Sequence, residues 1–136
     1  MKLYADGAGA ERTGRPGGWA FALVDGDALV LEGFGGDGCT TSLLMEFEAV
    51  QRGLKAALDA GVRELELISD CRIALDVVRG VFLPKPLHVR ARAEALHAVA
   101  QGLVVHPRWV RAHAGEAWNE AGDAMAAWAR DAQLHD

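Results

Sequence analysis

The segment Glu64-Leu65-Glu66-Leu67-Ile68-Ser69 is followed directly by Asp70. Its polar and apolar side chains alternate, which is typical of a β-strand with one buried face. Just before it, apolar side chains recur at helical spacing and predict a helix over residues 42–60. That helix should carry the chain back across a sheet. We therefore expect strand 64–69 to lie parallel to a strand at residues 2–6.

The other elements are predicted outward from this unit. Residues 8–16 should form a loop, and Asp25-Gly26 predicts a hairpin turn between strands 18–24 and 28–34, with the glycines at 35–38 ending the second strand. Further on, we expect helices at 72–79 and 87–101, an edge strand at 104–111 that contains Pro107, and a last helix at 117–132. This order predicts an α/β fold, in which a mixed five-stranded sheet has three antiparallel strands, then parallel strands, and helices on both faces.

The length of 136 residues suits one domain, which we expect to span residues 1–136. With 14 Lys and Arg against 19 Asp and Glu, a globally basic nucleic-acid-binding protein is excluded. The charge is nevertheless segregated, because residues 72–111 contain seven basic and two acidic side chains. A surface for a nucleic-acid backbone would explain this segment, and so would an ordinary solvated helix face.

No apolar run approaches the ~20 residues that cross a bilayer, and the N-terminus lacks the pattern of a signal peptide. Cys39 and Cys71 are 32 positions apart, which argues against a disulfide framework or a thiol-based zinc site. We therefore expect a protein of the reducing cytoplasm that does not associate with a membrane.

Acidic side chains are expected to converge at one edge of the sheet. Asp6 and Asp70 end the two parallel strands, and Glu46 lies one turn into the helix beside them. Asp123 lies in the last expected helix, on the same face as Asn119. Unpaired carboxylates repel by roughly 4 kcal/mol per pair at ~4 Å and an effective dielectric of 20. Bound Mg²⁺ would remove that repulsion, and carboxylates are ligands that it prefers, so the cluster fits a two-metal phosphodiester site.

Each acid also has an ordinary explanation when it is considered alone. Asp6-Gly7 is a common turn, and Asp70 could cap the helix that follows it. Glu46 could be a first-turn acid that the helix dipole favours, and Asp123 could be a solvated helix residue.

Five motifs in a fixed order strengthen the metal-site interpretation. The most specific runs from Trp109 to Asp123 and reads Trp109-Val110-Arg111-Ala112-His113-Ala114-Gly115-Glu116-Ala117-Trp118-Asn119-Glu120-Ala121-Gly122-Asp123. The others are Tyr4-Ala5-Asp6-Gly7, Gly14-Arg15-Pro16-Gly17-Gly18-Trp19, Thr40-Thr41-Ser42-Leu43-Leu44-Met45-Glu46 and Ser69-Asp70-Cys71. In these motifs the chain resembles the type 1 ribonuclease H (ribonuclease HI) family over nearly its whole length.

The resemblance implies a ribonuclease H-like fold and an endoribonuclease that cleaves the RNA strand of RNA–DNA hybrids by two-metal-ion hydrolysis. It implies that four acids bind Mg²⁺, with Mn²⁺ as a second candidate: Asp6, Glu46, Asp70 and Asp123. It also implies that His113 moves protons or helps to release product, and an unperturbed histidine pKa of about 6.5 suits proton transfer at neutral pH. Contacts with the substrate are expected from Thr41, Arg15, Arg72 and Asn119.

Some positions depart from the family pattern. Ser42 and Leu43 replace the usual asparagine pair that reads the minor groove of the hybrid, and Cys71 replaces the usual Ser or Asn. The basic, tryptophan-containing insertion of some members is absent, and residues 82–86 form a short link. Two alternatives stay open: a non-catalytic nucleic-acid-binding or interaction module on the same fold, and a related metal-dependent nuclease with another substrate. The expected partner is an RNA–DNA hybrid, and we expect the protein to act as a monomer.

Overall fold

The computed structural model describes residues 1–9 and 14–111. The described elements are, in chain order, β1 (Lys2–Ala8), β2 (Arg15–Asp25), β3 (Ala28–Thr40), α1 (Ser42–Asp59), β4 (Glu64–Ser69), α2 (Arg72–Arg79), α3 (Leu87–Ala100) and β5 (Val104–Trp109). The strands form a five-stranded sheet in the order β3-β2-β1-β4-β5. β1, β2 and β3 pair antiparallel, whereas β4 runs parallel to β1 and β5 runs parallel to β4. The predicted mixed sheet is confirmed, as is the parallel pairing of strands 2–6 and 64–69.

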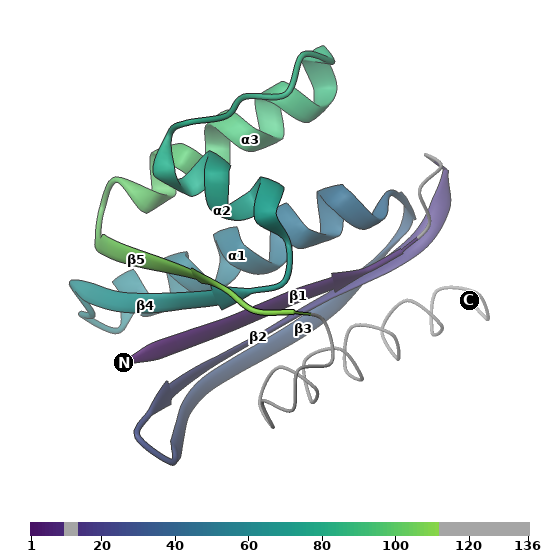
Figure 1. Ribbon diagram of the computed structural model, residues 1–136. Coiled ribbons are helices and arrows are strands. Elements are labelled where there is room, and N and C mark those ends of the chain that lie inside the picture. The colour runs from purple at the N-terminus through teal and green to yellow at the C-terminus, as the bar shows by residue number, and fades with distance from the viewer. Residues whose placement is uncertain (10–13, 112–136) are drawn as a thin grey trace.

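The helices that the structure describes lie on one face of this sheet (Figure 1). α1 packs on β1 and β2, α3 packs on α1, and α2 contacts α3 and β5. Strand and helix side chains form one core there, with Leu3, Phe47 and Leu67 fully buried. Tyr4, Val24 and Ile68 form a second, smaller buried group. The helix expected at 117–132 lies outside the described residues.

β2 and β3 are longer than the sequence predicts, and the expectation that the glycines at 35–38 end the second strand is wrong. Gly33 pairs with Phe21 and Gly35 pairs with Trp19 in the β2–β3 register. A Cβ atom on either glycine would lie 2.6 Å from the ring of its partner. The aromatic rings therefore occupy the space of the missing side chains, and the strand continues through the glycines. Of the loop expected at 8–16, Ala8 belongs to β1, and Arg15 and Pro16 belong to β2.

α1 begins and ends where the sequence predicts. Its N-cap is Thr41, whose Oγ1 accepts a hydrogen bond of 3.2 Å from the Leu44 N–H, and its C-cap is Ala60. The small residues on its inner face let it approach β1 closely, because a Cβ atom on Gly53 would lie 2.9 Å from Leu3 Cδ1.

β5 is an edge strand, as Pro107 predicts, because a proline has no N–H to donate to a further strand. Within residues 1–9 and 14–111, none of the helices combines the length and the apolar character that crossing a membrane requires.

Candidate active site

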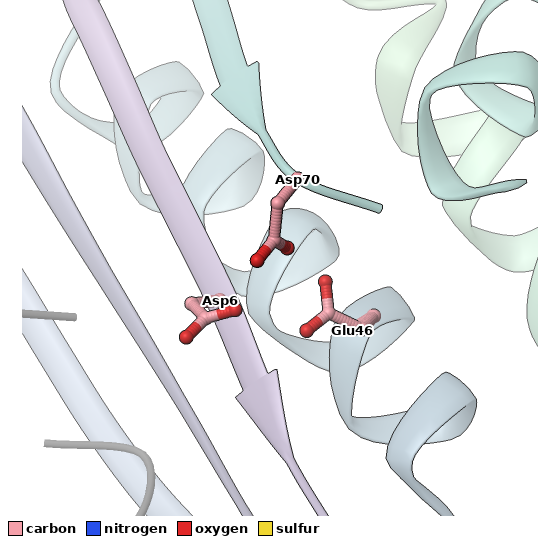
Figure 2. A group of neighbouring side chains, drawn as sticks. All are labelled: Asp6, Glu46 and Asp70. Atoms are coloured by element: carbon pink, nitrogen blue, oxygen red, sulfur yellow. The ribbon is translucent and has the colours of Figure 1, made fainter. Parts of the chain in front are cut away.

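Three carboxylates from separate elements meet at one edge of the sheet. Asp6 comes from β1, Glu46 from α1, and Asp70 follows the last residue of β4 (Figure 2). One carboxylate oxygen of each lies within 4.8 Å of the others. Asp6 and Glu46 are only 5% and 7% exposed, so the cluster is largely withdrawn from water. The sequence therefore predicted the convergence of these three residues correctly.

The ordinary explanations for the three acids do not fit the structure. Asp6 and Gly7 lie inside β1, where they pair with Ala20 and Trp19, so they do not form a turn. The N-cap of α2 is Cys71, so Asp70 does not cap that helix. The first turn of α1 contains no acid, because Glu46 is the fifth residue of the helix. None of the three acids is therefore explained by local structure alone.

Gly7 joins β1 to α1 at the cluster. Its N–H donates a hydrogen bond of 2.7 Å to Glu46 Oε1. A Cβ atom at this position would lie 2.5 Å from the carbonyl carbon of Met45 and would also collide with the main-chain nitrogen of Glu46. Only glycine allows the strand and the first turns of the helix to approach this closely. This role of Gly7 was not predicted, although a glycine directly after a candidate metal-binding aspartate is a usable signal.

The carboxyl group of Glu46 is electrostatically strained. Its pKa is raised from 4.5 to about 8, mainly by burial and in part by the negative charge of Asp70, whereas the hydrogen bond from the Gly7 N–H opposes the shift. Its second oxygen, Oε2, is buried and has no well-formed hydrogen bond within the described part of the chain. The neighbouring Cys71 thiol is at most a weak donor to this carboxylate. Burial and the charge of Glu46 in turn raise the pKa of that thiol to about 12.

These features fit a divalent cation. Mg²⁺ and Mn²⁺ prefer oxygen ligands from carboxylates, and a cation would give Glu46 Oε2 a stronger partner than any it has within residues 1–9 and 14–111. Its positive charge would also offset the burial and the repulsion from Asp70 that together raise the Glu46 pKa. The residues present therefore suit a hard metal ion better than a soft one, although one thiol adjoins the cluster.

The residues expected to bind substrate are only partly described. Thr41 is the N-cap of α1, the helix that contains Glu46, and Arg15 is exposed at the start of β2. The guanidinium carbon of Arg72 lies 3.9 Å from the ring centroid of Trp109, and the Trp109 indole N–H donates a hydrogen bond of 3.0 Å to the carbonyl oxygen of Asp70. His113, Asn119 and Asp123 lie outside the described residues.

The basic segment at 72–111 is less free to bind an anion than its composition suggests. Four of its arginines form ion pairs with acids, in the pairs Arg79–Asp76, Arg90–Glu94, Arg92–Glu48 and Arg108–Glu66. Much of the positive charge of this segment is therefore balanced by acids within the protein. For binding an anion, the few cations close to the carboxylate cluster matter more than the total number of basic residues.

Comparisons with known proteins agree with this fold and site. The family model described as RNase H matches residues 1–131. Ribonuclease H of Treponema pallidum subsp. pallidum is 32% identical over 149 aligned positions, which cover 93% of this chain and 88% of that protein.

Solved structures show the same likeness. RNase H1 from the halophilic archaeon Halobacterium salinarum NRC-1 has a TM-score of 0.81 at 28% identity, covering 96% of this chain and 97% of that one. LC11-RNase H1, whose crystal structure is in complex with an RNA/DNA hybrid, has a TM-score of 0.81 and covers 98% of both chains. Its 20% identity supports the shared fold alone. With a family model that spans nearly the whole sequence, a matching sheet and the converging acids, the chain belongs to the type 1 ribonuclease H family.

Proposed function

We propose that this protein is a metal-dependent endoribonuclease that cleaves the RNA strand of RNA–DNA hybrids. The observation that carries the proposal is the cluster of Asp6, Glu46 and Asp70, in which one buried Glu46 oxygen has no well-formed hydrogen bond to any residue that the structure describes. Family membership supports the same reaction, and a protein of this fold was crystallised with an RNA/DNA hybrid.

We assign the metal ligands to these three acids and to Asp123. Bound Mg²⁺ or Mn²⁺ would neutralise charge on the phosphodiester and lower the pKa of an attacking water, and a pair of ions would act on both the entering and the leaving oxygen. The protein contributes a prearranged set of oxygens, because the Gly7 N–H fixes one oxygen of Glu46. His113 is the proposed proton carrier, since an imidazole near its ordinary pKa can both accept and donate a proton at neutral pH.

The proposed substrate contacts come from two arginines and two polar side chains. Arg72 would meet a backbone phosphate with its guanidinium, and Arg15 would do the same from the first residue of β2. Thr41 and Asn119 are the proposed polar contacts. Leu43 has no hydrogen-bonding side chain, so we expect phosphate contacts to supply most of the affinity for the hybrid.

A non-catalytic binding module on the same fold is the weaker explanation. Holding three carboxylates within 4.8 Å of one another, with the Glu46 pKa raised to about 8, opposes folding and repels a polyanion. A protein that only bound nucleic acid would gain nothing from that arrangement, whereas a metal-dependent nuclease requires it.

A cleavage assay separates the candidate functions. Four labelled substrates of one sequence are compared with Mg²⁺, with Mn²⁺ and with EDTA: RNA–DNA hybrid, DNA duplex, RNA duplex and single-stranded RNA. We expect internal cuts in the RNA strand of the hybrid alone, only with metal, and none from Asp6→Asn. Equal cleavage of DNA or of free RNA would favour the related nuclease, and hybrid binding without cleavage by any metal would favour the binding module.

Oligomeric state and location complete the proposal. We propose that the protein acts as a monomer in the cytoplasm. Two free cysteines, Cys39 and Cys71, suit a reducing compartment.

A further inference from the structure

A tryptophan at the end of β5 contacts the main chain that follows β4. Trp109 is the last residue of β5 and pairs in register with Ser69, the last residue of β4. Beyond that pair, the indole Nε1–H donates a hydrogen bond of 3.0 Å to the carbonyl oxygen of Asp70. The edge strand therefore holds the backbone of a candidate metal ligand through a side chain.

The ring face of the same residue carries a cation. The guanidinium carbon of Arg72 lies 3.9 Å from the centroid of the Trp109 ring. Arg72 is exposed at the first position of α2, and within residues 1–9 and 14–111 it forms no ion pair with a carboxylate. Stacking occupies the face of a guanidinium and leaves its N–H groups at the edge available to an anion.

The geometry points to Trp109 as a positioning residue for hybrid cleavage, which holds the Asp70 main chain with its N–H and the Arg72 guanidinium with its ring. Arg72 then meets a backbone phosphate of the hybrid directly beside the carboxylate cluster. This inference rests on the proposed function and adds to it a residue that acts through two neighbours.

A cation held beside the carboxylates would offset the repulsion between the site and an anionic substrate. An anionic backbone must approach carboxylates that repel it, so a cation two residues from Asp70 lowers the barrier to approach. A free arginine would lose much rotamer freedom on binding a phosphate, whereas a stacked one is already restricted. The tryptophan is 39% exposed, so filling the core is not its main contribution.

Binding measurements in EDTA test the coupling between the two side chains without any cleavage. Anisotropy titrations with a labelled hybrid compare the parent protein, Trp109→Leu, Arg72→Gln and the double variant at several salt concentrations. We expect Arg72→Gln to weaken binding and to reduce the salt slope by about 1, as the loss of one phosphate contact should. Trp109→Leu should weaken binding by about two- to fivefold in the parent and by less than about twofold in the Arg72→Gln background.

The second arm isolates the N–H group. Trp109→Phe keeps an aromatic face but removes the donor to the Asp70 carbonyl, and it covers the case in which Trp109→Leu fails to fold. Single-turnover rates against enzyme concentration should show a maximal rate lowered by about tenfold, with half-saturation nearly unchanged. Calorimetric titration of Trp109→Phe with Mg²⁺, without nucleic acid, should show weaker metal binding than in the parent. If the melting temperature is unchanged, a purely structural role of Trp109 would not explain this loss.

A matched control exists on α1. Arg52 also stacks on a tryptophan, Trp19, at 4.4 Å from its ring centroid, but its guanidinium is already paired with Glu48. Arg52→Gln removes the same charge from a similar pair, and it should leave the hybrid affinity and the cleavage rate unchanged.

The outcomes separate this inference from the proposed function. If the parent protein cleaves no hybrid, the proposed function fails, and the binding cycle in EDTA still decides the coupling. If the parent cleaves but Trp109→Leu binds as the parent does, or weakens binding equally with and without Arg72, the role of the ring is refuted. An unchanged maximal rate and Mg²⁺ affinity in Trp109→Phe would refute the role of the N–H group.

Discussion

Burying the Glu46 carboxyl group beside Asp70 costs free energy in the folded protein. The cost is visible in the Glu46 pKa of about 8. Burial is the largest cause of this raised pKa, and the negative charge of Asp70 is the second. The single strong hydrogen bond from the Gly7 N–H recovers only part of it. A group kept in such a position is a strong candidate for function, because nothing in the local packing requires a carboxylate there.

Asp70→Asn should therefore separate stability from activity. At about pH 9, above the Glu46 pKa of about 8, Glu46 is ionised and Asp70→Asn removes the charge that repels it. We therefore expect the melting temperature in EDTA at that pH to rise by about 3 °C, which corresponds to about 1 kcal/mol. Hybrid cleavage with Mg²⁺ should disappear, because a neutral amide replaces a negatively charged carboxylate ligand. Calorimetric melting curves and the cleavage assay measure the two effects, and Glu32→Gln, an exposed acid on β3, is the control. Normal cleavage by Asp70→Asn would remove Asp70 from the site.

His113 gives a second prediction at the level of one residue, although it lies outside the described residues. We expect His113→Ala to lower kcat by roughly two to three decades, which is the usual contribution of a general acid or base. Metal affinity should be nearly unchanged, and the pH–rate profile should flatten between about pH 6 and 8. Single-turnover rates across pH and calorimetric titration with Mg²⁺ check these points. A large loss of metal affinity would instead make His113 a ligand.

At the level of elements, the site depends on how closely α1 approaches β1. Gly7 and Gly53 both lie at this interface, but a Cβ atom would meet different neighbours at the two positions. At Gly7 it would collide with the main chain of Met45 and Glu46, whereas at Gly53 its nearest neighbours are the methyl groups of Leu3. Main chain cannot move aside without shifting the helix, but a leucine side chain can repack.

Gly7→Ala should consequently be far more damaging than Gly53→Ala. The first change should lower the free energy of unfolding by about 1–3 kcal/mol and should strongly reduce cleavage, because Glu46 moves away from Asp6. The second should stay within about 1 kcal/mol of the parent, since alanine also favours the helix. Urea unfolding and the hybrid assay provide both measurements. Equal stability of the two variants would show that the contact at Gly7 can relax.

The sequence specifies most elements but not their lengths. The alternation in residues 64–69 and the helical spacing in 42–60 were sufficient to predict β4, α1 and the parallel partner of β4, because each pattern is local. β3 was predicted too short, because the glycines at 35–38 interrupt a local pattern, and Gly35 becomes an ordinary strand residue only opposite Trp19. Such cross-strand pairing depends on the register, which no local pattern contains.

The same limit applies to the site. The positions of Asp6, Glu46 and Asp70 could be predicted, because each lies near the carboxyl end of a strand or in the first turns of a helix at the same edge of the sheet. The main-chain contact of Gly7 with α1 and the two contacts of Trp109 depend on distances between elements, which a local pattern does not contain. The motif that contains Trp109 was recognised as a whole without a role for this residue.

On the scale of the whole molecule, the protein balances a net charge of −5 against an expected polyanionic substrate. Most arginines between residues 72 and 111 that the structure describes are engaged with acids. Affinity should then depend on a few placed cations and on the metal ions themselves, which convert the carboxylate cluster from a repulsive to an attractive feature.

Stability of the whole fold should therefore depend on pH and metal together. Glu46 has a pKa of 4.5 in an unfolded chain and about 8 in the fold. Between these values the unfolded chain has released a proton that the folded protein retains, so this group makes the free energy of unfolding fall as pH rises, by at most a few kcal/mol. Its contribution is fully present below pH 4.5 and is lost as pH rises through 8.

In EDTA, the stability of Glu46→Gln relative to the parent should increase from pH 5 to pH 8.5, because glutamine does not ionise. At pH 8.5, Mg²⁺ at 100 times its Kd should stabilise the parent by about 2.7 kcal/mol, and should stabilise Glu46→Gln much less. Urea unfolding at each pH, with Glu32→Gln as the exposed control, measures both effects. A constant difference between Glu46→Gln and the parent across this range would mean that Glu46 is ionised throughout. An equal Mg²⁺ effect in the two proteins would place the metal away from Glu46. The two results together decide whether Mg²⁺ binds the buried carboxyl group whose ionisation destabilises the fold.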